Sequence, residues 1–231
     1  MQVKDLKNYG RSMSEMLMDV PDDLQKQLQR IGRRKVSKEL GLLNLIRYVF
    51  LHRKEKARMS KLDLSAVREK GMRDEGFISS QIEWAAMFSA LSKLRGSEKA
   101  IQILNEVIEA TTPLAFAHMM PSIEDTKSFD DPFKAFKEYN LAGPEAARRS
   151  GCHDIEIVED TNDALQLDIT YCAWHEIARQ LGVEEACLPN CYSDDVLLPD
   201  YLEPLGIVFK RTNTLARGGS RCDFRFERAK A

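Results

Sequence analysis

The five cysteines are the residues of this sequence best suited to chemistry, and none of them lies in the first 151 residues: Cys152, Cys172, Cys187, Cys191 and Cys222. The thiolate form of cysteine is a nucleophile and a metal ligand. An odd number of thiols without a close-spaced framework argues against a disulfide-stapled secreted protein and favours a reducing compartment. No signal-peptide region is evident at the start of the sequence. We therefore expect a cytoplasmic protein.

Cys172 lies where a strand is predicted to meet a helix. Residues 165–171 alternate between apolar and polar side chains, which is typical of a half-buried strand, and residues 173–181 have helical spacing and end before Gly182. The amide groups and the dipole at a helix N-terminus lower the pKa of a thiol. His175 is three residues further on and can share a face with Cys172. The spacing predicts a reactive thiol with His175 as a base or an orienting group.

Two further cysteines have chemically suggestive neighbours. Cys191 begins the run Cys-Tyr-Ser-Asp-Asp, which we predict to be a loop that holds Asp194 and Asp195 close to a thiol. Cys222 alternates in register with Phe224, so both side chains point to the same face of a predicted strand. Sites tend to be built at such loops and element ends.

Cys152 and Cys187 have no such setting and are predicted to be packing residues, because free cysteine is often buried as a small hydrophobe. A zinc site is the alternative for the others, since Cys172, His175, Cys191 and Cys222 are ligands of suitable type. These four come from three separate elements and include no Cys-x-x-Cys pair, so we predict a site without a metal or another cofactor.

Helical periodicity dominates the sequence before the cysteines, and a period of two appears after them. Helices are predicted over residues 36–58, 81–94, 98–111, 132–139 and 144–149. Strands are predicted over residues 154–159 and 165–171, joined by a turn at 160–163, and over 207–212 and 221–227. The predicted fold is α+β, with a helical N-terminal half followed by a four-stranded antiparallel sheet in the order strand, strand, helix, strand, strand.

Charge divides the sequence into two parts. Residues 1–70 carry 17 Lys and Arg against 9 Asp and Glu, a net charge of +8, which leaves −10 for the remainder because the total is −2. This asymmetry predicts a basic helical arm over residues 1–72 and an α+β domain over residues 73–231.

The arm contains one predicted amphipathic helix, residues 36–58. Its apolar stripe consists of Leu40, Leu43, Ile46, Phe50 and Leu51, with basic residues between them. Such a helix can touch a membrane surface or a nucleic acid, or it can pack on the body or on a second subunit. We favour packing, because aromatic interleaving and a nucleic-acid motif are absent from the sequence. The expected partners are a small-molecule substrate and a second copy of the chain through the N-terminal helices, with no nucleic acid and no membrane span.

Sequence motifs narrow the chemistry further. The P-loop, Gly-x-Gly-x-x-Gly, Gly-x-Ser-x-Gly and His-Glu-x-x-His patterns are all absent, which counts against nucleotide, nicotinamide, serine-hydrolase and zinc-protease activities. The segments 191–195, 207–216 and 218–226, the last containing Cys-Asp-Phe-Arg-Phe, closely resemble the L-2-amino-thiazoline-4-carboxylic acid hydrolase family over roughly residues 80–228. A Gly-rich turn before a cysteine-bearing strand is also similar to vinyl-reductase-type small-molecule-binding domains.

The family resemblance implies hydrolysis of a cyclic amidine, L-2-amino-thiazoline-4-carboxylate, to a carbamoyl-cysteine. For this reaction Cys191 or Cys172 is the candidate nucleophile on the amidine carbon, Asp194 pairs with the amidinium, and His175 moves protons.

Other residues complete this hypothesis. Arg211 or Arg217 would bind the substrate carboxylate, and Phe224 would wall the pocket. A variant without covalent catalysis uses Asp194 or Asp195 to activate water, and Cys222 then only lines the site. A non-catalytic binding or sensor module with a cysteine-lined pocket is the alternative function.

Overall fold

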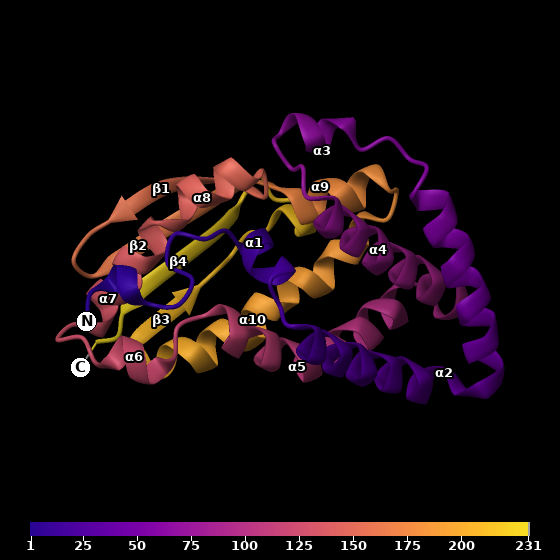
Figure 1. Cartoon of the computed structure of the whole chain (residues 1–231), viewed down its shortest axis with the longest axis horizontal. Coiled ribbons are helices and arrows are strands. Elements are labelled where there is room, and N and C mark those ends of the chain that lie inside the picture. The colour runs from indigo at the N-terminus through magenta and orange to yellow at the C-terminus, as the bar shows by residue number, and fades with distance from the viewer. Residues whose placement is uncertain (231) are drawn as a thin grey trace.

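The computed structural model describes residues 1–230 and has the predicted α+β fold. A helical N-terminal half leads into one four-stranded sheet, and the strand order across it is β1-β2-β4-β3 with every neighbouring pair antiparallel. In Figure 1 the sheet lies at the left, α4 and the later part of α2 lie at the right, and α5 and α10 run between the two ends. The beginning of the chain and its last described residues lie at the same end of the molecule as the sheet (Figure 1).

The helices and strands have the following bounds. The helices are α1 (Met13–Met18), α2 (Asp22–Met59), α3 (Ser65–Glu69), α4 (Glu75–Arg95), α5 (Ser97–Met119), α6 (Ile123–Lys127), α7 (Pro132–Leu141), α8 (Gly143–Ser150), α9 (Ala173–Gln180) and α10 (Leu188–Leu202). The strands are β1 (His153–Asp160), β2 (Ala164–Cys172), β3 (Ile207–Lys210) and β4 (Cys222–Arg228). None of the helices within residues 1–230 is long and apolar enough to cross a membrane.

The β1–β2 hairpin forms where the period-two pattern predicts it. Its turn is closed by the Thr161 amide, which donates to the Ala164 carbonyl at 2.9 Å. Leu165 and Leu167 of β2 face Phe226 and Phe224 of β4, and these side chains pack against α7 and α10. One face of the sheet is therefore buried under helices, which explains the alternation of apolar and polar residues.

The acidic segment around Cys191 is a helix, so the prediction of a loop there is wrong. Residues 191–195 lie in the interior of α10. Pro189 occupies the first turn, where proline is tolerated because that amide has no partner within a helix. Tyr201 and Leu202 at the other end are buried, and packing of this kind outweighs the weak helix propensity of the asparagine, serine and aspartates.

Helix α2 begins earlier than predicted and is kinked at Gly41. This glycine has φ 67° and ψ 169°, a conformation that favours glycine, so the helical phase is interrupted there. Leu40 is buried against α4 and α5, but Leu43, Ile46 and Phe50 are exposed by 80%, 65% and 70%. These three therefore do not pack on the body of the chain together with Leu40, and their packing on a second subunit stays a prediction.

The residues that do pack from this part of α2 lie on its other face. Met59 and Glu55 are buried, and Glu55 is satisfied by Ser89 and Lys93 of α4. The N-terminal segment thus packs on the rest of the chain. The boundary at residue 72 and the second copy of the chain stay predictions.

Gly151 ends α8 and fixes the entry into β1. Its φ is 68°, and a Cβ atom there would lie 2.2 Å from the backbone nitrogen of Met72. We expect Gly151→Ala to lower the free energy of unfolding by about 3 kcal/mol, because backbone strain and a clash with backbone combine. Chemical denaturation measures this loss.

The control for this prediction is Gly182→Ala. Gly182 has a similar φ of 72°, and nothing lies within 4 Å of its added Cβ. This variant should lose only about 1 kcal/mol, the cost of the left-handed conformation alone. Equal losses in the two variants would contradict the close packing of Gly151 on residues 71–72.

Candidate functional site

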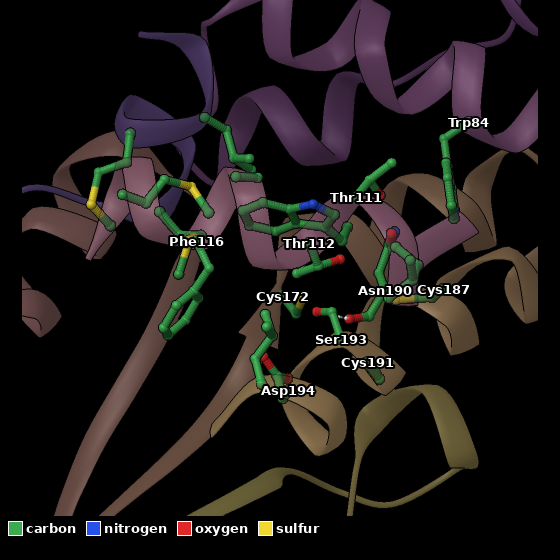
Figure 2. A pocket seen from close by; sticks show the side chains of 18 of the residues that line it. Trp84, Thr111, Thr112, Phe116, Cys172, Cys187, Asn190, Cys191, Ser193 and Asp194 are labelled. Carbon is green, nitrogen blue, oxygen red and sulfur yellow. Dashed lines mark hydrogen bonds between the residues drawn. The ribbon is translucent and has the colours of Figure 1, made fainter. Parts of the chain in front are cut away.

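A large cavity lies between the sheet and the helices. Its volume is about 1060 Å³, and it is bordered by α1, α2, α4, α5, α10 and the inner face of the sheet. Most of the lining side chains are apolar. The polar ones include His153, Cys172, Asn190, Asp194 and Arg211. Figure 2 shows Cys172 and Thr112 near the middle of this cavity, Asp194 below them, and Asn190, Cys187 and Cys191 to the right.

Cys172 and His153 are brought together by the β1–β2 register. They are directly opposite each other in the hairpin, and both line the cavity. Cys172 is also the N-cap residue of α9, so its thiol lies at the positive end of a helix. The His153 ring stacks on Trp174, with centroids 5.0 Å apart and planes at 12°. Trp174 packs edge-on against Phe77 at 4.6 Å, so the imidazole is held by a rigid aromatic support.

The surroundings stabilise Cys172 as a thiolate and His153 as an imidazolium. The interaction with the Cys187 thiol, the charge of His153 and the backbone N–H of His175 hold the pKa of Cys172 well below its ordinary value, although burial opposes this. Burial alone would lower the pKa of His153, but the charge of Cys172 and the contact with Cys152 raise it to about 10. Both shifts favour a charge pair of a thiolate and an imidazolium, which is the state that makes a cysteine a strong nucleophile.

The two cysteines predicted to be packing residues are buried in the core, as expected, and they also contact this pair. The Cys152 sulfur lies 3.5 Å from Nδ1 of His153. Interaction with Cys172 and Cys191 and burial raise the pKa of Cys187 well above its ordinary value, so it remains a thiol. A thiol beside a thiolate can donate a hydrogen bond to it, which agrees with the effect of Cys187 on Cys172.

A second charged group faces the cavity from α10 and the end of the β3 segment. Nη1 of Arg211 donates to Asp194 at 2.6 Å, and Nη2 donates to Asp195 at 2.6 Å and to the Cys191 carbonyl at 2.8 Å. Burial raises the pKa of Asp194 to about 6, although the charge of Arg211 opposes this. The Arg211 side chain is only 2% exposed, and within residues 1–230 its buried Nε has no hydrogen-bond partner. A buried donor of this kind is costly unless a ligand satisfies it.

The amino-acid sequence can also be compared with those of known protein families. The sequence signature of L-2-amino-thiazoline-4-carboxylic acid hydrolase matches residues 77–226, which is more than half of the chain. The chain belongs to this family. No curated protein and no solved structure matches it. The family region contains Cys172, His153, Asp194 and Arg211, whereas α1 and α2, which also border the cavity, lie outside it.

Within the family region, the cavity brings together Cys172, Cys191, Cys222, Asp194, Arg211 and Phe224 of the predicted site residues. Cys222 accepts from the Leu215 amide at 3.3 Å, and burial raises the pKa of its thiol to about 12. The Phe224 ring lies under the Arg211 guanidinium, and its centroid is 5.2 Å from the guanidinium carbon, Cζ. Cys222 is therefore a neutral wall residue, and Phe224 helps to position Arg211.

Three predicted site residues are not among those that line the cavity. The ring of His175 contacts Glu184, with Nε2 and Oε1 2.9 Å apart, and only the backbone N–H of this residue acts on Cys172. Asp195 pairs with Arg211 and, at 3.5 Å, with Arg217. Arg217 is 59% exposed on its side chain. The structure thus puts His153 where the sequence suggested His175.

His153 and Asn190 are the site residues that the sequence did not predict. The signal for His153 was incomplete, because the predicted turn at residues 160–163 would put it opposite Thr170. In the structure Asp160 pairs with Leu165, and the two irregularities of the hairpin, one on each strand, cancel each other, so that His153 lies opposite Cys172. Asn190 gave no such signal, because its place depends on α10. Its carbonyl accepts from the Ser193 hydroxyl at 2.6 Å (Figure 2). Across residues 1–230, no three His, Cys, Asp or Glu side chains are grouped so that they could hold a metal ion.

Proposed function

We propose that this protein is a thiol-dependent hydrolase that opens a small cyclic amidine such as L-2-amino-thiazoline-4-carboxylate. One observation carries the proposal: the charge pair of Cys172 and His153 lies at a helix N-terminus inside a cavity. Family membership supports the type of substrate. A soft thiolate nucleophile suits the ring carbon that lies between sulfur and two nitrogens.

In the first step, the Cys172 thiolate attacks this ring carbon and forms a carbon–sulfur bond. The bond from the same carbon to the ring sulfur breaks, because a thiolate leaves more readily than an amide anion. His153 gives its proton to the departing sulfur. The product of this step is an isothiourea joined to Cys172, with a free thiol on the opened substrate and a neutral imidazole at His153.

In the second step, the neutral imidazole removes a proton from water, and the oxygen attacks the same carbon. The second proton of this water moves to the imine nitrogen as the carbonyl group forms, the bond between the carbon and Cys172 breaks, and a carbamoyl-cysteine leaves. The Cys172 thiolate and the His153 imidazolium are restored, so the cycle consumes one water molecule and needs no oxidant, reductant or metal ion.

Asp194 and Arg211 bind the substrate in this proposal. The Asp194 carboxylate pairs with the amidinium and keeps the ring carbon electrophilic. The free Nε of Arg211 donates to the substrate carboxylate. Asp195 fixes the other end of the guanidinium and is a positioning residue.

The test is incubation of the purified protein with L-2-amino-thiazoline-4-carboxylate in water enriched in oxygen-18, with product detection by mass spectrometry. We expect a carbamoyl-cysteine that contains one oxygen from water, and none in a sample without protein. A ligand that binds saturably and is recovered unchanged would contradict the proposal and would favour a binding module.

A further inference from the structure

The cavity is much longer than the ring of an aminothiazoline. One face of α5 lines it through Val107, Thr111, Ala115 and Met119, which follow each other at intervals of four. At 1.5 Å per residue these positions span about 18 Å. The volume of about 1060 Å³ is at the upper end for sites that hold drug-sized ligands. A five-membered ring with an amino group and a carboxylate fills only a small part of it.

The reactive pair lies part-way along this length. In Figure 2, Thr112 and Cys172 lie between Phe116 on the left and Asn190 with Cys187 on the right. The cavity therefore continues beyond the reactive thiol toward the C-terminal end of α5. Half of the length of the α5 face is about 9 Å, which is close to the length of an extended octyl chain.

The end of the cavity beyond the thiol contains a group of flexible apolar side chains, with polar side chains such as Asn8 and Arg11 at its border. Its walls include Met119, Met120, Met13 and Met16, and the segment before α1 is tied to this end by Asn8, whose Nδ2 donates to the Met119 carbonyl at 2.7 Å. Methionine has a flexible, polarisable side chain that adjusts to ligands of different shape.

Part of this apolar wall is outside the region that matches the family. Met13, Met16 and Leu28 line the cavity from α1 and α2, whereas the family region begins at residue 77. The N-terminal helices thus enlarge a site whose reactive groups lie in the family region.

We propose that the substrate of this protein carries an extended apolar arm in addition to its reactive head. The head binds at Cys172, Asp194 and Arg211, and the arm lies along α5 between Thr112 and Met119. This inference rests on the proposed function for the identity of the head. The chemical class is an amphiphile of this shape: a cyclic amidine with a carboxylate at one end and an alkyl or aryl chain at the other.

The experiment compares three probes by isothermal titration calorimetry on the whole chain of residues 1–231, with Cys172→Ser as the common background so that the thiazolines are bound without being consumed. They are 2-aminothiazoline-4-carboxylate, its 2-octylamino derivative, and decanoate, which has a chain but no amidine. We expect the octyl derivative to bind at least about 100-fold more tightly than the parent compound, since each buried methylene strengthens binding about fourfold. Equal affinities of the parent and octyl compounds would overturn the inference.

A pair of variants locates the arm. Ala115→Phe fills the cavity on the lining face of α5, and Ala117→Phe makes the same change at an exposed position of the same helix that does not line the cavity. We expect Ala115→Phe to weaken binding of the octyl derivative and of decanoate at least about tenfold, with the parent compound unaffected. Ala117→Phe should bind all three probes as the Cys172→Ser background does. Equal weakening of the parent and octyl compounds by Ala115→Phe would contradict the placement.

Decanoate separates this inference from the proposed function. Binding of decanoate that Ala115→Phe weakens and Ala117→Phe does not supports the apolar extension even when neither thiazoline binds or reacts. That outcome would contradict the proposal of a cyclic amidine as the reactive head and would leave the apolar arm standing. If decanoate does not bind and the two thiazolines bind with equal affinities, the inference of an apolar arm is overturned, and the proposed function is unaffected.

Discussion

Replacing Cys172 with serine is expected to lower the rate of ring opening at least about 10³-fold, the scale of loss seen when a catalytic nucleophile is removed. Serine keeps nearly the same shape at the end of β2, but its hydroxyl does not ionise near neutral pH, even beside His153 and a helix N-terminus. The measurement is the steady-state rate of product formation, with circular dichroism and a denaturation curve to show that the variant is folded.

The comparison for this prediction is Cys191→Ser. Cys191 lines the same cavity, but it lies in the interior of α10 and is not paired with an imidazole in the β1–β2 register. We expect its variant to retain at least about a tenth of the activity. An inactive Cys191→Ser beside an active Cys172→Ser would assign the nucleophile to Cys191. Near-normal rates in both variants would end the covalent mechanism and favour water activated by Asp194.

Replacing His153 with phenylalanine is expected to lower turnover at least about 10²-fold, because the proton carrier and the positive partner of Cys172 are lost together. Phenylalanine preserves a ring that can stack on Trp174. Without the imidazolium, the pKa of Cys172 should rise. Alkylation of this thiol by iodoacetamide at pH 6.5, followed by peptide mass mapping, should therefore become at least about tenfold slower.

His175→Phe is the matched control for this prediction. The His175 ring contacts Glu184 and does not line the cavity, and its backbone N–H is unchanged by the substitution. Turnover and the alkylation rate of Cys172 should stay within a few-fold of the unchanged protein. A larger loss in His175→Phe than in His153→Phe would restore His175 as the proton carrier and contradict the role given to His153.

The sequence predicted the sheet well because its signals are local. The alternation in residues 165–171, the turn at 160–163 and the helix that follows Cys172 each depend on neighbouring residues, and all three are found. The same signals predicted that Cys172 lies at the end of a strand and the start of a helix, which the structure confirms. The family region also agrees with the resemblance read from residues 191–226.

The parts that were missed depend on contacts between distant segments. Helix α10 contains Asn190, Ser193 and three aspartates, which are weak helix formers, and it is helical because its ends are buried against other elements. Since this segment was expected to be a loop, the double pairing of Arg211 with Asp194 and Asp195 was not foreseen. The first half of α2 is rich in lysine and arginine and has no clear apolar period, so only its later part was predicted.

The pairing of His153 with Cys172 gives the short turn between β1 and β2 a chemical role. Side chains on a strand alternate between its two faces, so a shift of one residue in this hairpin would turn His153 away and bring the neighbouring Asp154 toward the thiol. A carboxylate in that place would repel the thiolate instead of stabilising it. The number of residues between Asp160 and Ala164 is therefore as much a determinant of reactivity as the identity of any catalytic side chain. In the proposed mechanism, an insertion that shifts this register would act as an active-site mutation although the turn never touches the substrate.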